Sequence, residues 1–468
     1  MKCDLEFTGS KSAKGFLHRC KNCGGEAWSK YEDPRRRKQT CELSVPAVPG
    51  LRLPPPKYPP LSQIEIDRRL EICAGCEYWL ADKAACKVCG SCASGQKMLQ
   101  GLARDPGKRC PHPKGAKWGP NVLRVAFLTP GLHMGGAERW LASLCRHFDR
   151  SKILPAYVIV KESKFLSPEC KAWFPPDTHV SLHIEHLPAA MKQVDMLVSW
   201  GPVDLDSLTK GAKIPIVDAC HGTLGHWEGG DRDGFKVQEV IARQAIASGA
   251  HLAAVSEECI GNYPSEVRDR VTVIPNGAEV SRVQSSLTKE EARQRFGIPD
   301  GQKVVLFVGR FAKEKNLQAL VDAMDYLPGW TLLAAGPQHQ MPSRTEGKPI
   351  IMPGSVDPPA DLYRAADVLC MPSFHEAHSL TLIEGNLAGV PVASADYPAM
   401  KWLTQKHGPL ATLFPPRCPP QEIAAAIELA ATATEAAKRI QELSLATYTA
   451  EKMALRWQDY LCSKASSK

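Results

Sequence analysis

The chain has 468 residues, of which 44% are hydrophobic, 7% aromatic and 23% charged, and its net charge is +8. This length accommodates about three domains, and the composition is ordinary for a globular protein with a sizeable core. No apolar run approaches the roughly 18 residues that a membrane helix needs, and the N-terminus has no apolar stretch typical of a secretory signal. We therefore expect a cytoplasmic protein, with peripheral membrane association left open, whose 17 cysteines are reduced thiols or metal ligands rather than a disulfide framework.

Charge and cysteine are unevenly distributed along the chain. Residues 1–120 contain 22 Lys and Arg against 12 Asp and Glu, a net of +10, which leaves −2 for the remaining 348 residues. The same block contains 10 of the 17 cysteines. We infer that two kinds of protein are joined near residue 120.

Residues 1–45 predict a small metal-binding module. A C-x2-C knuckle with two outlying cysteines is a common way to assemble a tetrahedral Zn2+ site, in which His18 could replace one thiolate. The four cysteines are Cys3, Cys20, Cys23 and Cys41. Without a metal, a segment with so few apolar positions could hardly bury a core. The alternative is a disordered tail with incidental cysteines.

A second cysteine-rich module is expected over residues 63–120, beyond a linker over residues 46–62 that contains seven prolines and is typical of an extended polyproline spacer. Its cysteines are Cys73, Cys76, Cys86, Cys89, Cys92 and Cys110. Six cysteines exceed the four ligands of one zinc site. The C-x2-C-x2-C run also half-resembles a ferredoxin cluster, but the x3-C-P that should follow is missing, so we favour zinc over iron–sulfur.

A basic, cysteine-rich extension raises the question of nucleic-acid binding. Residues 35–38 form its one dense basic cluster, and such a short run is more often a solvated loop. Neither block has the C2H2 spacing, and neither interleaves aromatic residues as a stacking surface would. Docking of a partner protein or of an acidic acceptor is therefore ranked at least as high as nucleic acid.

Residues 121–285 predict a Rossmann-like domain. The first strand is expected over residues 122–128, and the loop after it leads to a helix starting near Ala137. In that loop Gly135 and Gly136 allow the backbone to approach a ligand closely, and the helix N-terminus favours a phosphate. Further strands are expected over residues 156–160, 196–199, 214–217, 252–255 and 271–274. Alternation with helices predicts a mainly parallel sheet.

Residues 286–468 predict a second Rossmann-like domain. Its first strand is expected over residues 304–308, and Gly309, Arg310 and Lys315 lie in the loop and helix start beyond it. Further helices are expected over residues 424–431, 435–443 and 448–461. The last of these looks like a helix that crosses back to the first half, and the alternative is a terminal helix that stays on its own domain.

Two glutamates flank a predicted helix start in this second domain. A buried strand is expected over residues 368–371, Glu376 follows in the loop, and Ser379 is a candidate N-cap. The helix then begins at Leu380 and contains Glu384. Free backbone N–H groups at its mouth form an anion site. Two acids around such a site suggest a ligand with both phosphates and hydroxyls, such as a nucleotide sugar.

These segments resemble a known family. The spacing Glu376-x7-Glu384, followed by residues 388–392, resembles the signature of retaining glycosyltransferases of the GT-B fold, family 4. Four other segments match the family in the expected order, namely Gly135-Gly136-Ala137-Glu138, Ala254-Val255-Ser256-Glu257, Val273-Ile274-Pro275-Asn276-Gly277 and residues 304–316. The resemblance covers roughly the last three quarters of the chain.

The resemblance assigns roles on the donor side. It implies that Glu384 holds the ribose hydroxyls and Glu376 the transferred sugar. Gly309, Ser379 and Leu380 would complete the donor site. One departure affects the sugar contact: the family loop usually has glycines after its first glutamate, whereas this chain has Ala377-His378-Ser379. The sugar that is transferred is therefore left open.

Charged and polar groups around the expected cleft complete the catalytic set. Arg310 and Lys315 would stabilise the departing diphosphate and replace a catalytic metal; the alternative is that they are surface cations. His221, just beyond the expected strand at 214–217, could hydrogen-bond a sugar hydroxyl or be satisfied by nearby backbone. Gly135 and Gly136 would form the phosphate or acceptor loop.

We therefore expect an α/β protein of the GT-B fold, with two Rossmann-like domains facing a cleft and small cysteine-rich zinc modules before them. It would transfer a sugar from a UDP-, GDP- or ADP-linked donor to an unknown hydroxyl acceptor with retention of configuration. Zn2+ would be structural, in the N-terminal modules, with no metal needed for catalysis. Two alternatives remain: a nucleotide-sugar epimerase of the same fold, and a non-catalytic GT-B platform that carries a zinc-dependent nucleic-acid- or protein-binding module.

Overall fold

The computed structural model describes residues 122–465, apart from residue 134, residues 163–167, residue 202 and residues 223–241. It also describes the backbone of five short strands nearer the N-terminus. The side chains of all ten candidate zinc ligands, from Cys3 to Cys110, lie outside the described residues. The zinc modules therefore stay a prediction.

The N-terminal strands form two small antiparallel sheets. In the first, the order is β1 (Leu5–Ser12), β2 (Gly15–Cys20) and β3 (Glu26–Ser29), with Leu5 opposite Cys20. In the second, β4 (Trp79–Leu80) pairs with β5 (Ala85–Cys86), with Trp79 opposite Cys86. Cys20 thus ends a strand just before Cys23, and Cys86 lies opposite a position three residues after Cys76.

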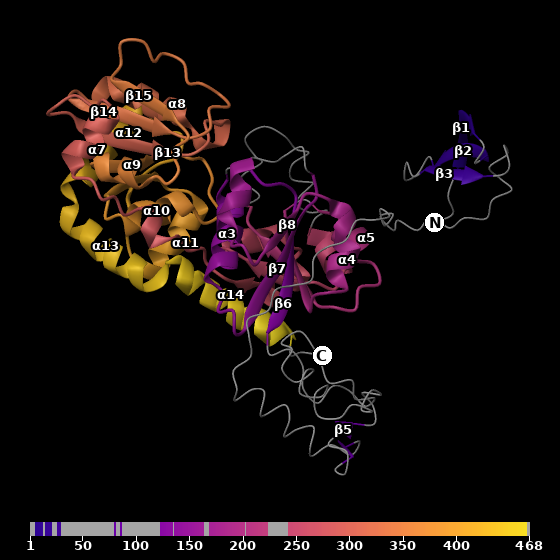
Figure 1. Cartoon of the computed structure of the whole chain (residues 1–468). Helices are drawn as coiled ribbons and strands as arrows, with labels where there is room; N and C mark the ends of the chain where they lie inside the picture. Colours follow the sequence, from indigo (N-terminus) through magenta and orange to yellow (C-terminus); the bar gives the residue numbers. More distant parts are fainter. Residues whose placement is uncertain are drawn as a thin grey trace.

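The first large sheet is parallel and has the strand order β12-β11-β10-β9-β6-β7-β8, of which Figure 1 labels β6, β7 and β8. Its strands are β6 (Leu123–Thr129), β7 (Ile153–Val160), β8 (His179–Ser181), β9 (Met196–Trp200), β10 (Ile216–Cys220), β11 (His251–Ala254) and β12 (Thr272–Val273). Its helices include α3 (Gly136–His147), α4 (Leu187–Met191) and α5 (Leu205–Thr209). The strands expected from sequence are confirmed, although β10 ends at Cys220, so that His221 directly follows it.

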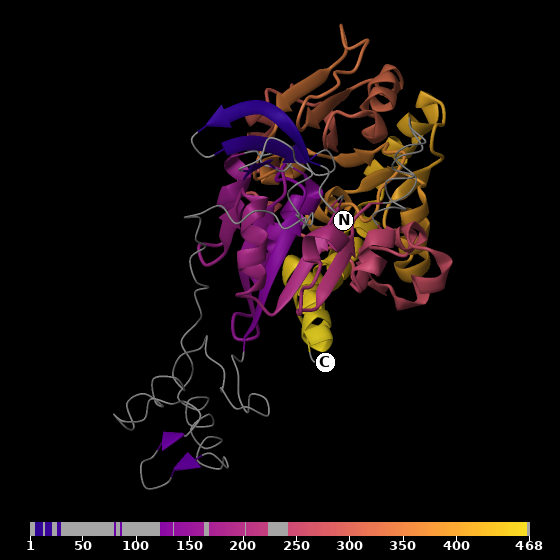
Figure 2. The same ribbon diagram turned by 90° about the vertical axis from the view of Figure 1, so that its right-hand side faces the viewer.

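The second sheet is also parallel, with the order β15-β14-β13-β16-β17-β18. Figure 2 shows the orange and yellow second half beside the magenta first half. Its strands are β13 (Lys303–Val308), β14 (Trp330–Ala335), β15 (Ile350–Gly354), β16 (Val368–Met371), β17 (Val392–Ala395) and β18 (Thr412–Phe414). The helices are α7 (Lys289–Arg295), α8 (Leu317–Ala323), α9 (Ala360–Ala365), α10 (Leu380–Leu387), α11 (Pro398–His407), α12 (Pro420–Thr432) and α13 (Thr434–Thr447). The central strands of both large sheets are buried, as expected when helices cover both faces, whereas the edge strands β12, β15 and β18 are partly exposed.

Strand order fixes where a ligand can bind. In each large sheet the first strand has its successor on one side and a later strand on the other: β6 lies between β7 and β9, and β13 between β14 and β16. Ligands of open parallel sheets bind at such a switch point, outside the carboxyl ends of the strands. The glycine loop follows β6, Gly309 follows β13, and Glu376 follows β16.

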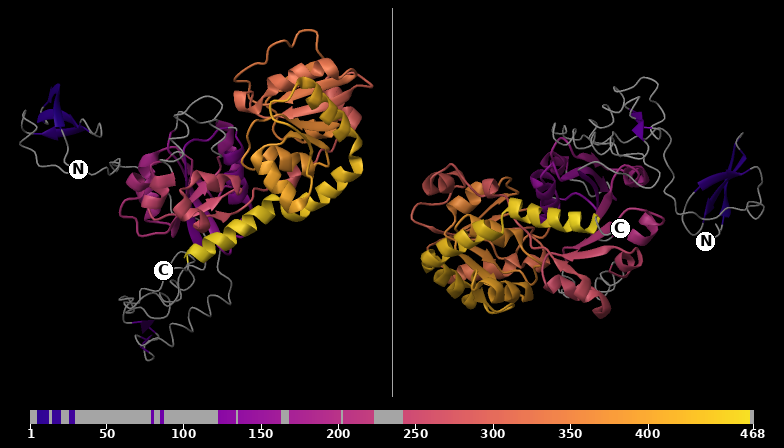
Figure 3. Two further views of the ribbon diagram at one scale, coloured as in Figure 1. Left: turned by 180° about the vertical axis from the view of Figure 1, so that it is seen from behind. Right: turned by 90° about the horizontal axis from the view of Figure 1, so that it is seen from below.

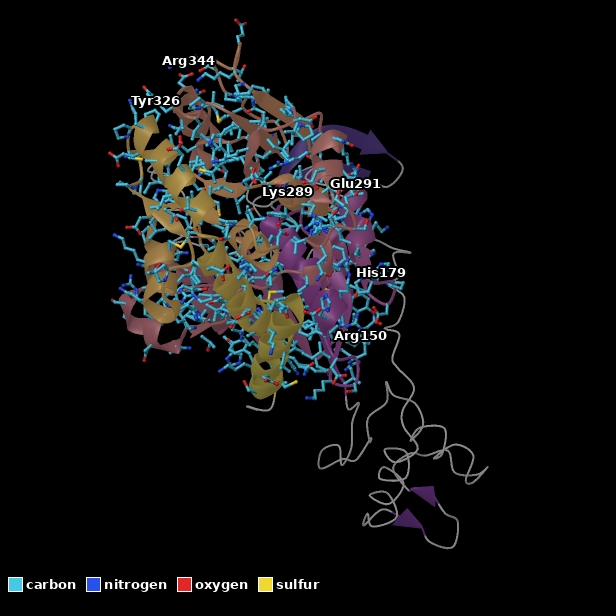
Figure 4. The ribbon with its side chains drawn as sticks, turned by 90° about the vertical axis from the view of Figure 1, so that its left-hand side faces the viewer. Arg150, His179, Lys289, Glu291, Tyr326 and Arg344 are labelled. Atoms are coloured by element: carbon cyan, nitrogen blue, oxygen red, sulfur yellow. The ribbon has the colours of Figure 1, made fainter. Side chains whose placement is uncertain are left out.

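A capping box begins the second domain. The Thr288 hydroxyl accepts a hydrogen bond from the N–H of Glu291, whose carboxylate accepts one from the N–H of Thr288. Lys289 on the same helix pairs with Asp367, 2.6 Å away, which ties α7 to the residue before β16. Figure 4 labels Lys289 and Glu291 at this helix start.

The chain crosses between the two halves twice, and the two crossings are paired. The N–H of Ala278 donates to the Tyr448 carbonyl at 2.9 Å, and the N–H of Ala450 donates to the Ala278 carbonyl at 2.8 Å. Beyond the second crossing, α14 (Ala450–Ala465) extends from the second half along the first (Figure 3). The prediction of a terminal helix that crosses back is thus confirmed.

Aromatic contacts hold α14 on the first half. Trp457 packs edge-on against Trp140 of α3, with 5.3 Å between ring centroids. The Tyr460 hydroxyl donates to the carbonyl of Leu252 in β11. Both tryptophans are fully buried.

Among the described residues, no helix has both the length and the apolarity to cross a lipid bilayer.

We predict that Gly277→Ala destabilises the protein by about 1–3 kcal/mol, because a Cβ at this crossing would overlap the Thr449 carbonyl oxygen and lie 2.7 Å from its carbon. Thermal unfolding measures the change. Gly261→Ala is the matched control, since nothing lies within 4 Å of a Cβ there. Equal melting temperatures for the two variants would contradict the assigned close packing of the crossings.

Candidate active site

One cleft of about 850 Å³ lies between the two halves, at the carboxyl ends of their central strands. It is lined from both sides. Ten residues proposed from sequence line it together: Gly135, Gly136, His221, Gly309, Arg310, Lys315, Glu376, Ser379, Leu380 and Glu384. Residues separated by up to about half the chain are thus brought into one space, as the switch-point rule requires.

Glu384 lies inside α10 on the donor side of the cleft and is only 7% exposed. One carboxylate oxygen accepts a 2.8 Å hydrogen bond from the Tyr363 hydroxyl, and the other lies 4.0 Å from Nε of Arg282. Burial raises the pKa of Glu384, an effect opposed by Arg282 and by the Tyr363 hydrogen bond. The carboxylate is therefore held in place, with limited access to solvent.

Lys315 and Glu376 form an ion pair in the wall of the cleft, on the donor side. The Lys315 ammonium lies 2.6 Å from Oε1 of Glu376, and both side chains are largely buried. Arg310 differs from the expectation of a fixed cation in a closed site, because its side chain is 45% exposed and pairs with Glu314. Of the two cations, Lys315 is therefore better placed to contact a ligand inside the cleft.

The N-terminus of α10 opens into the cleft as expected. The Ser379 hydroxyl caps the helix by accepting from the N–H of Leu382, which confirms the predicted N-cap. Ser379 and Leu380 line the cleft at the helix start. This end of α10 can therefore receive a negatively charged group.

The carboxyl group of Glu138 lies against the glycine loop that contains Gly135 and Gly136. Its Oε2 would lie 2.5 Å from a Cβ at Gly135, so the carboxyl group rests directly against the loop. Glu138 is 5% exposed, and burial raises its pKa to about 7 although the N–H groups of Glu138 and His133 and the charge of Arg310 favour ionisation. The expected phosphate position beside Gly135 is thus already adjacent to a carboxyl group of the chain itself.

His221 lies on the first half of the cleft between two tryptophan rings. Its ring centroid is 4.1 Å from that of Trp140 and 5.9 Å from that of Trp200. Burial lowers its pKa to about 3, so the imidazole is neutral. Its Nε2 is buried and has no hydrogen-bond partner among the described residues. Such an atom can bind a ligand hydroxyl.

Two further polar groups lie near His221. Asp218 on β10 accepts a 2.8 Å hydrogen bond from the Tyr263 hydroxyl, and burial raises the pKa of Asp218 to about 6. Asn262 donates from its amide to the Gly222 carbonyl, while its side-chain oxygen is buried without a partner in the described part of the chain. All of these residues line the cleft. This side of the cleft therefore offers several hydrogen-bonding groups.

An ion pair that sequence analysis missed spans the cleft. Arg139 of α3 lies 3.0 Å from Asp357, which follows β15 on the other half, and Asp357 also lies 2.6 Å from Arg282. The Arg139 guanidinium in addition stacks 3.3 Å above the Trp173 ring. Arg139 directly follows the Gly-Gly-Ala-Glu motif, which was a usable signal. Asp357 belongs to no recognised motif.

No group of three or more His, Cys, Asp or Glu residues suited to a metal occurs in the part of the chain that the structure describes. The cysteines outside the N-terminal block are free thiols at Cys145, Cys170, Cys220, Cys259, Cys370, Cys418 and Cys462. The predicted zinc ligands are not among the described side chains.

Comparison with known proteins is strongest for the second half. Residues 288–444 match the family model described as Glycosyl transferases group 1. The chain is 30% identical over 210 residues to the putative teichuronic acid biosynthesis glycosyltransferase TuaC of Bacillus subtilis, a match covering 43% of this chain and 51% of that one. It is 29% identical over 213 residues to D-inositol 3-phosphate glycosyltransferase of Nocardia farcinica, covering 39% and 47%. The chain thus spans about half the length of these relatives.

Solved structures resemble both halves. HepE of Anabaena, in complex with UDP and glucose, superposes with a TM-score of 0.61 at 19% identity, covering 73% of this chain and all of that one. Sucrose-phosphate synthase of Thermosynechococcus elongatus superposes with a TM-score of 0.55 at 18% identity, covering 74% and 100%. These similarities establish the fold: residues 122–465 form a GT-B-like structure with two Rossmann-like domains.

We predict that Glu138→Gln removes a pH dependence of stability. The folded-state pKa of about 7 exceeds the ordinary 4.5, so the stability contributed by the protonated group is complete below pH 4.5 and is lost as the pH rises through 7. Relative to the wild type, the variant should gain up to about 3 kcal/mol between pH 5 and pH 8. Thermal unfolding at both pH values measures this, with Glu428→Gln on the exposed face of α12 as control. If the difference in stability between the variant and the wild type were the same at pH 5 and pH 8, the raised pKa assigned to Glu138 would be contradicted.

Proposed function

We propose that this protein is a retaining glycosyltransferase that moves a sugar from a nucleotide diphosphate donor to an acceptor hydroxyl. One observation carries the proposal: a single interdomain cleft combines Glu376, Lys315 and Glu384 with an open helix N-terminus. These residues belong to the half that matches Glycosyl transferases group 1. The combination of acids, a cation and free N–H groups suits a ligand that has hydroxyls and phosphates.

On the donor side, each group has a distinct proposed task. Glu384, oriented by Tyr363, would accept hydrogen bonds from the ribose hydroxyls. Glu376 would contact the transferred sugar, with Gly309 allowing close approach of the backbone. The α10 N-terminus at Ser379 and the Lys315 ammonium would bind the diphosphate, whose charge grows as the glycosidic bond breaks.

The reaction needs no protein nucleophile in this proposal. The bond between the anomeric carbon and the diphosphate oxygen breaks, and its electron pair stays on the diphosphate. The acceptor hydroxyl attacks on the same face, and its proton passes to a phosphate oxygen of the leaving group. Lys315, and Arg310 from the rim, would stabilise that oxygen in place of a metal.

His221 would bind a hydroxyl of the sugar through its unpartnered Nε2, since it is neutral and close to the acceptor-side polar groups. Closure of the cleft would exclude water and limit hydrolysis of the donor. The Arg139–Asp357 pair favours the closed arrangement, because it joins the two halves directly.

For the N-terminal block, we propose structural Zn2+ bound by the cysteines named above. The backbone registers support it, because Cys20 pairs with Leu5, two residues after Cys3, and Cys86 pairs with Trp79, three residues after Cys76. Metal analysis of anaerobically purified protein tests this proposal, and iron with acid-labile sulfide would contradict it. The block would serve protein or acceptor docking.

A donor screen by thermal shift tests the function directly, because a ligand that binds the folded state raises the melting temperature. UDP-glucose is the first choice, since a structurally similar protein was solved with it, followed by GDP- and ADP-linked hexoses. Product analysis with donor alone distinguishes an epimerase, which converts the sugar without an acceptor. A protein that binds no nucleotide sugar would leave only the binding-platform alternative.

We predict that Glu384→Gln weakens donor binding by about ten- to a hundredfold, because the loss of a charged acceptor for buried hydroxyls costs about 1.5–3 kcal/mol. Calorimetric titration with the donor found in the screen measures this. Glu442→Gln on α13 is the control of equal chemistry outside the cleft. Unchanged affinity would remove Glu384 from the donor site.

We predict that Lys315→Met lowers the turnover number more than the donor affinity, since the charge it meets is largest in the transition state. Arg310→Met should have the smaller effect, because its guanidinium is more exposed. Initial rates with and without EDTA provide the second measurement. If EDTA abolishes transfer while the protein stays folded, and Mg2+ or Mn2+ restores it, a metal performs the task assigned here to Lys315.

A further inference from the structure

His378 connects the donor loop to the first crossing between the two halves. It lies in the loop between Glu376 and α10, on the wall of the cleft. Its ring Nδ1 accepts a 2.9 Å hydrogen bond from the backbone N–H of Asn276. In return, the Asn276 side-chain amide donates to the His378 carbonyl at 2.8 Å. Two hydrogen bonds therefore join residues 102 positions apart in the sequence.

The environment of His378 enforces this bonding. The side chain is 4% exposed, and burial, assisted by the nearby cations Lys406 and Arg456, lowers its pKa to about 3. The imidazole is therefore neutral, and because Nδ1 accepts, the proton is on Nε2. Without the ring, the Asn276 N–H would be buried and unpaired, which is unfavourable.

His378 also contacts the second crossing. Its ring packs edge-on against Tyr448, with 5.4 Å between centroids, and against Trp402 at 5.9 Å. Tyr448 is the residue whose carbonyl accepts from Ala278 at the point where the two crossings pair. One side chain of the donor loop thus touches both connections between the halves.

Glu384 is held by contacts outside this junction, whereas Ser379, the N-cap of α10, directly follows His378 in the chain. Glu384 is held by Tyr363 and Arg282, and the helix cap by Ser379, all within the second half or next to it. A donor could therefore dock on the second half without the His378 contacts. Because the two crossings connect the halves, we expect an approach of the first half, which would bring His221 toward the sugar, to alter their geometry.

We propose that His378 is a positioning residue that couples the donor loop to the interdomain crossings, so that occupation of the loop drives closure of the cleft. The proposal rests on the proposed function for its ligand but not for its geometry. A donor that orders the loop between Glu376 and Ser379 also fixes Asn276, because the two segments move together.

Two substitutions at His378 separate the contribution of its hydrogen bond to Asn276 from the contribution of its ring packing. His378→Phe keeps an aromatic ring against Tyr448 but removes the acceptor. His378→Asn places its Oδ1 at the position of Nδ1, so it keeps the acceptor and loses the ring. A purely packing role predicts that the Asn variant is the more damaged one, whereas coupling through the hydrogen bond predicts the reverse.

The first measurement needs no donor. Amide hydrogen exchange of the full chain should be about 10- to 100-fold faster over residues 274–280 in His378→Phe than in the wild type or His378→Asn, while residues 304–308 stay unchanged. Equal exchange in all three proteins would overturn the link. Faster exchange throughout the chain in His378→Phe would also overturn it, since the residue would then serve global stability.

The second measurement uses UDP-glucose, or whichever nucleotide sugar the screen identifies. His378→Phe should bind this donor within about threefold of the wild type yet lose about tenfold or more in turnover number, and its radius of gyration in X-ray scattering should no longer contract on donor addition. His378→Asn should restore both. Contraction and turnover at wild-type levels in His378→Phe would overturn the coupling. If the wild type binds no nucleotide sugar, the proposed function fails, and the exchange comparison decides the link by itself.

Discussion

The paired crossings are the constraint on which the rest of the structure depends. Ala278 exchanges backbone hydrogen bonds with Tyr448 and Ala450, and Gly277 beside it leaves no room for a Cβ. These contacts set the angle at which the two parallel sheets face each other. The two halves are thus joined at the paired crossings, while α14 packs on the first half through Trp457.

Charge compensation is a second theme of the cleft. Lys315 is paired with Glu376, Asp357 with both Arg139 and Arg282, and the raised pKa of Glu138 favours its neutral form. Unpaired charges in a largely closed site are costly, so internal partners are expected when no ligand is bound. A donor would have to replace such partners, which makes the charged groups sensitive to its phosphates and hydroxyls rather than to its base.

The two halves differ in how firmly similarity identifies them. The second half matches a family by sequence, whereas the likeness of the first half to solved structures, at less than 25% identity, establishes its fold alone. This division has a physical basis in the proposed reaction. A nucleotide diphosphate presents the same phosphates and ribose to every enzyme that uses it, whereas acceptors vary.

The sequence by itself determined the parallel sheets, the cap at Ser379 and ten of the residues that line the cleft, because strand periodicity, capping and motif spacing are local properties. Tertiary structure alone decided two features: the Arg139–Asp357 pair across the cleft and the bonding of His378 to Asn276. Each feature joins residues that are far apart in the sequence, so it depends on how separate helices, strands and loops pack together. A local pattern specifies which face of an element is buried, but only the packed structure specifies which distant group that face meets.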